Sequence, residues 1–301
     1  MNTLTQTAII LLFASFIISC NKKEDTTSPA TAQLVAGVNE ISIDQTIEGK
    51  TVSRKVYIKA PTDLSGSTQS YPVVFAFHGS GGSGMQYLSN TTLNQLIDGK
   101  EFIGVYPNGH ANDGSSGGYW NLGTEATTAD DVEFVKLIVQ QLAKYPELDT
   151  SKMYAFGFSN GAGMVNLLGK SSDHFRAIAP LFSQQIISTG NLTPAKTLSV
   201  FQVNGAVDNL VPVNGGTSKV GEFLSAENSA LNWAKTFNCS TTVVQQDLVW
   251  KTAQVKSYSY ANCDSSHEVR YMVALATGHG FGNQEVDNIL FTEIWKFFQQ
   301  H

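Results

Sequence analysis

Charged residues are scarce in this sequence of 301 residues: only 15% are Asp, Glu, Lys or Arg, and the net charge is −6. Lysine and arginine never occur in runs longer than two, so the chain lacks the basic patch that nucleic-acid binding requires. We therefore exclude a nucleic-acid partner. With 42% hydrophobic residues, the chain can bury a large core, which predicts a globular protein.

Long hydrophobic runs are also missing beyond the N-terminus, so no later segment is predicted to span a membrane. Residues 8–18 are apolar but too few for a comfortable span, and they end at Ser19-Cys20. A small residue before a cysteine resembles the bacterial lipobox, which predicts a lipoprotein signal peptide over residues 1–19. An ordinary secretory signal is the alternative, because residues 1–8 contain no lysine or arginine.

We accordingly expect an exported protein that is lipidated at Cys20 and held at a bacterial membrane, the outer membrane being favoured, on its periplasmic or cell-surface side. Residues 20–33 are polar and small, as in a flexible tether. Residues 34–301 remain for a catalytic domain, without an internal repeat or a linker to a second one. We expect this protein to be a monomer.

Cysteine is rare, with three residues in the chain. Once Cys20 is assigned to the lipid, Cys239 and Cys263 remain as an even pair in an oxidising compartment, which favours a disulfide over two separate thiols. Neither has a His or Cys at ligand spacing, so no metal site is expected. No Gly-Lys-Ser/Thr or complete Gly-x-Gly-x-x-Gly follows the glycine-rich segment after residue 77, so no cofactor is expected.

The remaining pattern alternates strands with helices. Repeated strand, crossover and strand units predict an α/β fold in one domain: a mostly parallel central sheet with helices on both faces, whose ligands lie at the carboxyl ends of the strands. Residues 51–58 alternate between polar and apolar, as in a half-buried strand, which predicts an antiparallel strand at the edge of the sheet. Strands are expected at 51–58, 71–77, 102–106, 153–156, 177–182, 198–203 and 268–275, and helices at 130–142, after residue 161, at 222–237 and at 286–300.

The pattern Gly-x-Ser-x-Gly occurs twice. At residues 157–161 it follows a strand-like run and opens a helix-like one, whereas at residues 114–118 it lies in a polar loop. A strand-to-helix turn at such glycines exposes the serine hydroxyl and frees the next backbone N–H to face an oxyanion. Ser159 is therefore the candidate nucleophile.

A serine nucleophile needs a histidine base and a carboxylate that orients it. Asp208 follows the strand at 198–203 and is the preferred acid, with Asp247 and Asp264 as rivals and a turn-capping role as the alternative. His279 follows the last strand between glycines and is the preferred base. Of the other histidines, His267 precedes its strand, His110 and His174 lie in polar loops, and His301 is terminal.

An oxyanion needs two backbone donors. Asn160 supplies one N–H, and the glycine-rich segment after residue 77 supplies the second, for which we choose Ser80. His78 is interpreted mainly as a hydrogen-bonding residue. Three aromatic residues are candidates to line the substrate cleft: His78, Trp120, for which packing beneath a loop is an equal alternative, and Phe281.

From about residue 51 onward, the chain resembles the α/β-hydrolases of the polyhydroxybutyrate depolymerase, feruloyl esterase and acetylxylan esterase group. The resemblance implies the α/β-hydrolase fold and a serine esterase that uses Ser159, Asp208 and His279 on esters of plant polysaccharide or short hydroxyacid polyesters. It also supports the bridge between Cys239 and Cys263. The matching segments are 77–80, 106–109, 120–121, 130–134, 157–161, 208 with 211–212, and 278–279.

The chain departs from the group at two places beside the expected cleft. Asn204 stands where the group usually has histidine, and Phe281 falls in a segment that usually contains a tryptophan and a proline. These differences leave the acyl and sugar preference open. Two alternatives also remain, a lipase or peptidase of the same fold, which the short connections disfavour, and a non-catalytic glycan-binding lipoprotein, which an intact triad disfavours.

Overall fold

The computed structural model describes residues 32–64, 69–110, 117–123 and 129–301. The expected signal peptide, Cys20 and residues 20–31 of the expected tether lie outside the described residues, as does most of the second Gly-x-Ser-x-Gly match. The chain from residue 31 onward forms one compact unit. Within the described ranges, no helix combines the length and the apolar character that crossing a membrane requires.

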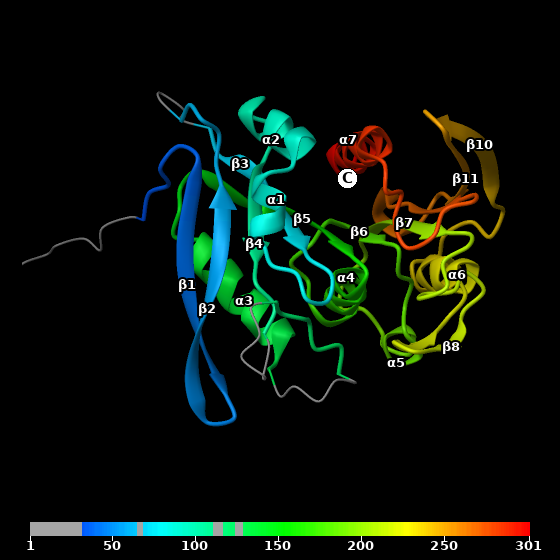
Figure 1. The fold of residues 1–301 in the computed structure, drawn as a ribbon, viewed down its shortest axis with the longest axis horizontal. Helices are drawn as coiled ribbons and strands as arrows, with labels where there is room; N and C mark the ends of the chain where they lie inside the picture. The colour runs from blue at the N-terminus through cyan, green and yellow to red at the C-terminus, as the bar shows by residue number, and fades with distance from the viewer. Residues whose placement is uncertain (1–31, 65–68, 111–116, 124–128) are drawn as a thin grey trace, which may run out of the picture. The chain divides into compact units, whose positions relative to one another are not determined.

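A ten-stranded sheet organises this unit (Figure 1). Its order is β1-β2-β4-β3-β5-β6-β7-β12-β11-β10. The strands are β1 Val38–Ile47, β2 Lys50–Lys59, β3 Tyr71–Phe77, β4 Ile103–Pro107, β5 Leu148–Phe158, β6 Ala177–Leu181, β7 Ser199–Gly205, β10 Val244–Trp250, β11 Ala253–Tyr260 and β12 Val269–Ala274.

The six strands in the middle of the sheet, from β4 to β12, are parallel, and two antiparallel strands extend it at each end. Four of the central strands, β3, β4, β6 and β7, are almost entirely buried, as parallel strands covered on both faces must be. The prediction of a mostly parallel sheet is confirmed.

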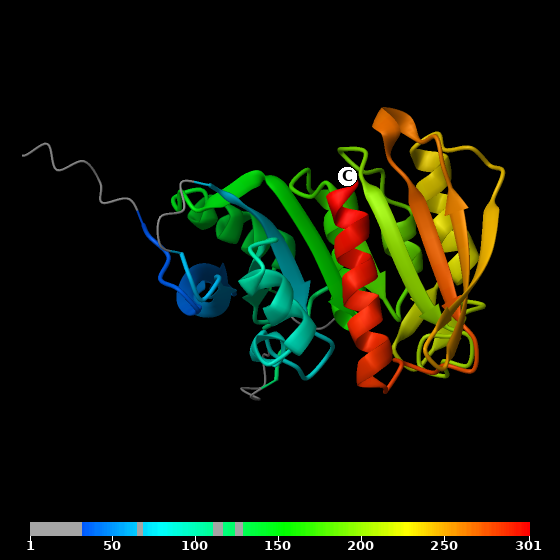
Figure 2. The ribbon, with the colours of Figure 1, turned by 90° about the horizontal axis from the view of Figure 1, so that it is seen from above.

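Helices cover both faces of the sheet (Figure 2). On one face, side chains of α3 (Asp131–Leu142), α4 (Asn160–Ser171) and α6 (Ala226–Thr236) share a core with Phe75 and Phe77 of β3. On the other face, α2 (Thr91–Asp98) and α7 (Gln284–Gln299) share a core with Val74 and Ala76. Successive residues of β3 thus serve opposite cores, as the period of a strand requires.

The shorter elements lie in the connections. They are the helices α1 Met85–Leu88, α5 Ile187–Gly190 and η1 Asp264–Ser266, and the two-stranded sheet of β8 Gly216–Ser218 and β9 Gly221–Phe223.

One predicted helix is wrong at its start. We expected a helix over residues 222–237, but residues 221–223 form β9 and α6 begins at Ala226, where the Ser225 hydroxyl caps the N–H of Asn228. The segment before Ser225 instead forms the hairpin of β8 and β9, in which Ser218 pairs with Gly221 and residues 219–220 make the turn. This correction matters for function, because β9 forms part of a pocket wall.

Candidate active site

Ser159 occupies the tight turn between β5 and α4. Its φ of 57° and ψ of −118° are a conformation that a residue with a side chain rarely adopts. The glycines of the motif allow the close packing around this turn: a side chain on Gly157 would overlap the carbonyl oxygen of Gly161, and one on Gly161 would overlap that of Phe77. The turn therefore presents the serine hydroxyl at the carboxyl edge of the sheet.

The structure brings Ser159 together with both predicted partners. Nε2 of His279 lies 2.7 Å from Oγ of Ser159, and Nδ1 lies 2.7 Å from Oδ2 of Asp208. Because a carboxylate only accepts hydrogen bonds, His279 donates from Nδ1 to Asp208 and accepts at Nε2 from the serine hydroxyl. That tautomer is the one in which the imidazole can remove a proton from Ser159.

Asp208 is itself held in place. Its Oδ1 accepts hydrogen bonds from the backbone N–H of Leu210 at 2.8 Å and of Val211 at 2.9 Å, and its side chain is 1% exposed. The turn-capping role weighed as an alternative is thus present as well, on the oxygen that His279 does not use. One carboxylate both shapes its loop and orients the imidazole.

The rival residues lie elsewhere. Asp247 is exposed on β10, and Asp264 accepts a hydrogen bond from the side chain of Asn238. His267 pairs with the hydroxyl of Ser199, at the edge of the sheet where β7 begins. The opposite edge carries the Ser159 loop, so none of these residues reaches the nucleophile.

The two predicted oxyanion donors flank Ser159. Asn160 is the first residue of α4, where backbone N–H groups have no partner within the helix. Ser80 follows β3, and the Cβ of Ser159 lies 3.5 Å from where a side chain on Gly79 would start. Among the described residues, neither the Ser80 nor the Asn160 N–H has a hydrogen-bond acceptor. Both amides are therefore free to face an oxyanion.

His78 and Trp120 do not line a cleft, which corrects one expectation. Both are fully buried. The indole N–H of Trp120 donates to the carbonyl of His78, and Nε2 of His78 accepts from the N–H of Gly109. Burial lowers the pKa of His78, and the ring stays neutral with its Nδ1–H directed at the Gly79 carbonyl. Both residues pack behind the glycine-rich loop, the alternative considered for Trp120.

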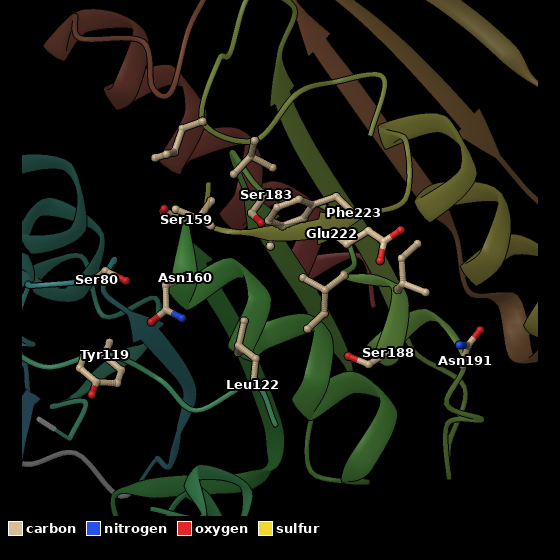
Figure 3. Close-up of a pocket in the computed structure, with 16 residues that line it drawn as sticks. Ser80, Tyr119, Leu122, Ser159, Asn160, Ser183, Ser188, Asn191, Glu222 and Phe223 are labelled. Carbon is tan, nitrogen blue, oxygen red and sulfur yellow. The ribbon is translucent and has the colours of Figure 1, made fainter. Parts of the chain in front are cut away.

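A pocket of about 720 Å³ opens beside Ser159 (Figure 3). Ser80, Ser159 and Asn160 lie at one end, and Ser188 and Asn191 at the other. We call this the larger pocket. Its walls are mainly apolar and come from α5, the loop after Asp208, and β9, with Leu122, Ile186, Leu210, Val211, Val220 and Phe223 among them. Among the described residues that line it, Glu222 is the only charged one.

A second pocket, of about 560 Å³, lies on the side of His279. We call this the smaller pocket. Phe281 lines it, as expected for a cleft residue, together with Phe158 and Phe182. The ring of Phe158 meets the imidazole of His279 edge-on, with ring centres 5.3 Å apart. Aromatic packing thus holds the imidazole of His279 on the side of the smaller pocket.

Sequence reasoning missed the buried amides that support the larger pocket. The side chain of Gln184 donates to the carbonyls of Pro212 and Leu224, and it accepts from the side chain of Asn204. Asn204 is buried rather than beside the cleft, which corrects the expectation that this departure from the group borders the substrate. Its role is to hold the hairpin segment onto the sheet. The glycines at 215, 216 and 221, which adopt positive φ angles, were the one local signal of a turn in this segment.

The disulfide between Cys239 and Cys263 is present. It joins the residues after α6 to those before η1, away from Ser159. Within the described ranges, no group of three or more His, Cys, Asp or Glu side chains is arranged to hold a metal ion.

No protein-family model matches the chain. It is 29% identical over 256 residues to feruloyl esterase B of Piromyces equi. The aligned residues cover 82% of this chain and 45% of that protein. It is 22% identical over 254 residues to the bifunctional acetylxylan esterase/xylanase XynS20E of Neocallimastix patriciarum, covering 82% of this chain and 33% of that protein. The chain spans half or less of the length of these two curated relatives. Feruloyl esterase C of Emericella nidulans is 26% identical over 275 residues, covering 88% of this chain and 87% of that protein.

Among solved structures, an acetyl xylan esterase from Aspergillus awamori superimposes with a TM-score of 0.60, at 15% identity, over 88% of this chain and 99% of the other. An acylaminoacyl peptidase superimposes with a TM-score of 0.53, at 15% identity, over 87% of this chain and 41% of the other. Likeness at such low identity establishes the fold alone. The chain therefore has the α/β-hydrolase fold, and its resemblance to the feruloyl and acetylxylan esterase group is confirmed.

Proposed function

We propose that this protein is a serine esterase that hydrolyses carboxylic esters through an acyl-enzyme. The observation that carries the proposal is the hydrogen-bonded chain from Asp208 through His279 to Ser159, with both contacts at 2.7 Å. The strained turn at Ser159 and the two free amides beside it complete the parts that acyl transfer needs.

In the proposed mechanism, Oγ of Ser159 forms a bond to the ester carbonyl carbon while its proton passes to Nε2 of His279. The carbonyl oxygen becomes an oxyanion, which the N–H groups of Ser80 and Asn160 stabilise. The bond to the alcohol oxygen then breaks, and His279 returns the proton to that oxygen. A water molecule repeats the sequence on the acyl-enzyme and releases the acid.

The two pockets support an assignment of the two halves of the ester. His279 must deliver its proton to the departing alcohol, so the alcohol belongs on the side of the smaller pocket, which His279 lines. The acyl group then enters the larger pocket. At about 720 Å³, that pocket is within the range of roughly 300–1,000 Å³ typical for small-molecule sites and is far larger than an acetyl group needs.

A mainly apolar pocket of this size favours an aromatic acyl group such as feruloyl over acetyl. The similarity to feruloyl esterases supports the same choice, with the ester carried on plant polysaccharide. Acetyl esters of polysaccharide are the second candidate, favoured by the similarity to acetylxylan esterases. Short hydroxyacid polyesters are the third candidate, and their acyl group would also have to enter the larger pocket.

Purified protein assayed on p-nitrophenyl acetate, methyl ferulate and acetylated xylan tests the proposal. We expect Ser159→Ala to reduce kcat by at least about 10⁴-fold and Asp208→Asn by about 10⁴-fold, because the asparagine amide no longer favours the required tautomer. Asp247→Asn and His267→Ala, at the two rival positions, are the matched controls and should retain full activity. A Ser159→Ala variant as active as the wild type would exclude the mechanism.

The same panel of substrates separates the candidate acyl groups. A higher kcat/KM for methyl ferulate than for p-nitrophenyl acetate, despite the poorer leaving group, supports a feruloyl substrate. Release of acetate from xylan without hydrolysis of methyl ferulate supports the acetyl alternative. If Ser159 is reactive but no ester of the panel is hydrolysed, a peptidase of the same fold is favoured.

We also propose that the protein is exported and anchored by a lipid on Cys20. The apolar residues 8–18, the cysteine that follows them and the disulfide between Cys239 and Cys263 support this location. Cys20→Ala should move the protein from the membrane fraction to the soluble fraction. Retention of this variant in the membrane would argue against the lipid anchor.

A further inference from the structure

The two amides that face the oxyanion lie on separate segments. The N–H of Ser80 belongs to the loop after β3, and that of Asn160 to the first turn of α4. An oxyanion accepts hydrogen bonds from both only if their separation is held constant, because donor atoms must lie within about 2.7–3.1 Å of the charge. The molecule therefore needs a connection between these two segments.

Trp120 makes contacts with both segments. Its backbone N–H donates to Oδ1 of Asn160 at 2.7 Å, and its carbonyl accepts from Nδ2 of Asn160 at 3.0 Å. Its indole N–H donates to the carbonyl of His78 at 2.8 Å, two residues before Ser80. One fully buried residue thus links the side chain of one oxyanion residue to the loop that carries the other.

Neighbouring aromatic rings hold the side chain of Trp120 in place. Its ring packs against those of Phe77 and His78, with ring centres 5.1 and 4.9 Å away. Gly118, two residues before Trp120, also binds the glycine-rich loop: Gly81 donates to the carbonyl of Gly118, and Gly118 donates to that of Gly82.

The following residue, Asn121, is anchored by its N–H to Asp131, whose carboxylate forms a buried ion pair with Arg54 at 2.7 Å. These contacts leave Trp120 little freedom to shift. Burial also strengthens each hydrogen bond, because the surroundings have a low dielectric constant.

We propose that Trp120 is a positioning residue for the oxyanion hole, which sets the separation between the Ser80 and Asn160 amides through its indole N–H and its backbone. This inference rests on the proposed serine-hydrolase mechanism. Trp120 touches no substrate, so its loss weakens binding of the transition state and leaves binding of the ground state nearly unchanged. The expected signature is a fall in kcat at constant KM.

Trp120→Phe removes the indole N–H and keeps an aromatic ring against Phe77 and His78. Asn160→Ala removes the side-chain hydrogen bonds to the Trp120 backbone and keeps the Asn160 backbone N–H. It therefore tests the proposal if Trp120→Phe does not fold. Trp233→Phe is the matched control. Trp233 is also fully buried and donates its indole N–H to a side chain, Oδ1 of Asn166 at 3.3 Å, but it belongs to α6 and this hydrogen bond reaches neither of the two oxyanion segments.

The three variants and the wild type are compared by melting temperature, by kcat and KM on p-nitrophenyl acetate, and by the rate at which an alkyl fluorophosphonate labels Ser159. In the labelling reaction, Oγ forms a bond to phosphorus, fluoride leaves, and His279 takes the proton. The phosphoryl oxygen occupies the oxyanion hole, so labelling reports on that hole whether or not carboxylic esters are the natural substrate.

We expect Trp120→Phe and Asn160→Ala to lower both kcat and the labelling rate by about 10- to 100-fold, less than the loss of a whole donor. KM should change by less than about threefold, with the pH dependence of kcat unaltered. Trp233→Phe should lower the melting temperature without slowing either reaction.

Wild-type labelling rates in both Trp120→Phe and Asn160→Ala would overturn the proposal, as would an equal loss in Trp233→Phe. A wild-type protein that is labelled but hydrolyses no carboxylic ester would reject the esterase function and leave the labelling comparison to decide the role of Trp120. Absence of labelling in the wild type would overturn both.

Discussion

Three residues at the carboxyl edge of the sheet hold backbone conformations that side chains rarely adopt. Ser159, Phe182 and Ala276 have φ angles of 57°, 55° and 53°, and they follow β5, β6 and β12. Each such residue costs of order 1–3 kcal/mol and persists only where its surroundings enforce it. The N–H of Ser159 donates to the carbonyl of Leu181, and that of Phe182 to the carbonyl of Val203. Neighbouring strands thus hold the strain in place.

Lys170 is a buried cation on α4 without a carboxylate partner among the described residues. Its ammonium donates to Oδ1 of Asn232 at 2.8 Å and lies over the ring of Trp233. Burial lowers the pKa of Lys170 from 10.5 to about 8. Between these two values the unfolded chain binds a proton that the folded chain does not, so stability conferred by this residue rises with pH.

We therefore expect the free energy of unfolding of the wild type, relative to Lys170→Met, to increase between pH 7 and pH 10.5. The gain should be about 2 to 3 kcal/mol, with most of it appearing above pH 8. Urea unfolding of both proteins across this range measures it. Lys136→Met, at an exposed position on α3, supplies the background. A difference between wild type and variant that stays constant with pH would contradict a lowered pKa for Lys170.

The three residues of the proposed triad could be predicted individually, and the contacts of Trp120 could not. Ser159, Asp208 and His279 each follow a strand, and the carboxyl ends of parallel strands meet at one edge of the sheet. The contacts of Trp120 with Asn160 and His78 span 40 and 42 residues of sequence and depend on the register of two loops. No local pattern encodes such contacts, and the same holds for Asn204, which binds Gln184.

At the level of elements, the strand–turn–helix unit around Ser159 packs with no space for further atoms. A side chain on Gly161 would overlap the carbonyl oxygen of Phe77 and lie 2.6 Å from that of His78. Both oxygens belong to the backbone and cannot move without displacing the glycine-rich loop after β3. The turn and that loop are thus fitted to each other.

We expect Gly161→Ala to abolish most activity and to destabilise the fold by about 2 kcal/mol or more, because overpacking of this kind costs about 1–3 kcal/mol. Thermal unfolding and kcat on p-nitrophenyl acetate measure the two effects. Gly99→Ala is the control: it lies at the end of α2, where a side chain would approach the carbonyl oxygen of Gln95 at 3.1 Å, which is tight but does not overlap as at Gly161. A fully active Gly161→Ala variant would show that the turn adapts more than its packing suggests.

The elements that the sequence did not predict are short or polar. β10 is exposed along most of its length, and the inward-facing positions of β1 include the polar Asn39 and Gln45, so neither has the apolar run that identifies a buried strand. Both are paired on one side only, at the two ends of the sheet. Their strand conformation comes from pairing with β11 and β2, which is a tertiary effect.

Across the whole molecule, the antiparallel strands β11 and β10 extend the parallel sheet beyond β12, the strand that leads into His279. The disulfide between Cys239 and Cys263 encloses this hairpin, because one cysteine follows α6 and the other precedes η1. Cys263 lies before the start of β12, and His279 lies after its end. The bridge and the candidate active site therefore occupy opposite edges of the sheet.

Replacing both cysteines, with Cys239→Ser and Cys263→Ser, should lower the free energy of unfolding without changing the rate of the folded enzyme. A bridge across a sequence separation of 24 residues reduces the entropy of the unfolded chain by an amount worth about 3 kcal/mol, which corresponds to a fall in melting temperature of about 5–10 °C. Hydrogen exchange should accelerate first in residues 240–262, because the hairpin loses its covalent attachment and is paired with the rest of the sheet only through β12. Denaturant unfolding, hydrogen exchange and kcat on the same samples separate the effects. A large fall in kcat while the variant remains folded would mean that the bridge supports the His279 loop through β12, and the two edges of the sheet would then be coupled rather than independent.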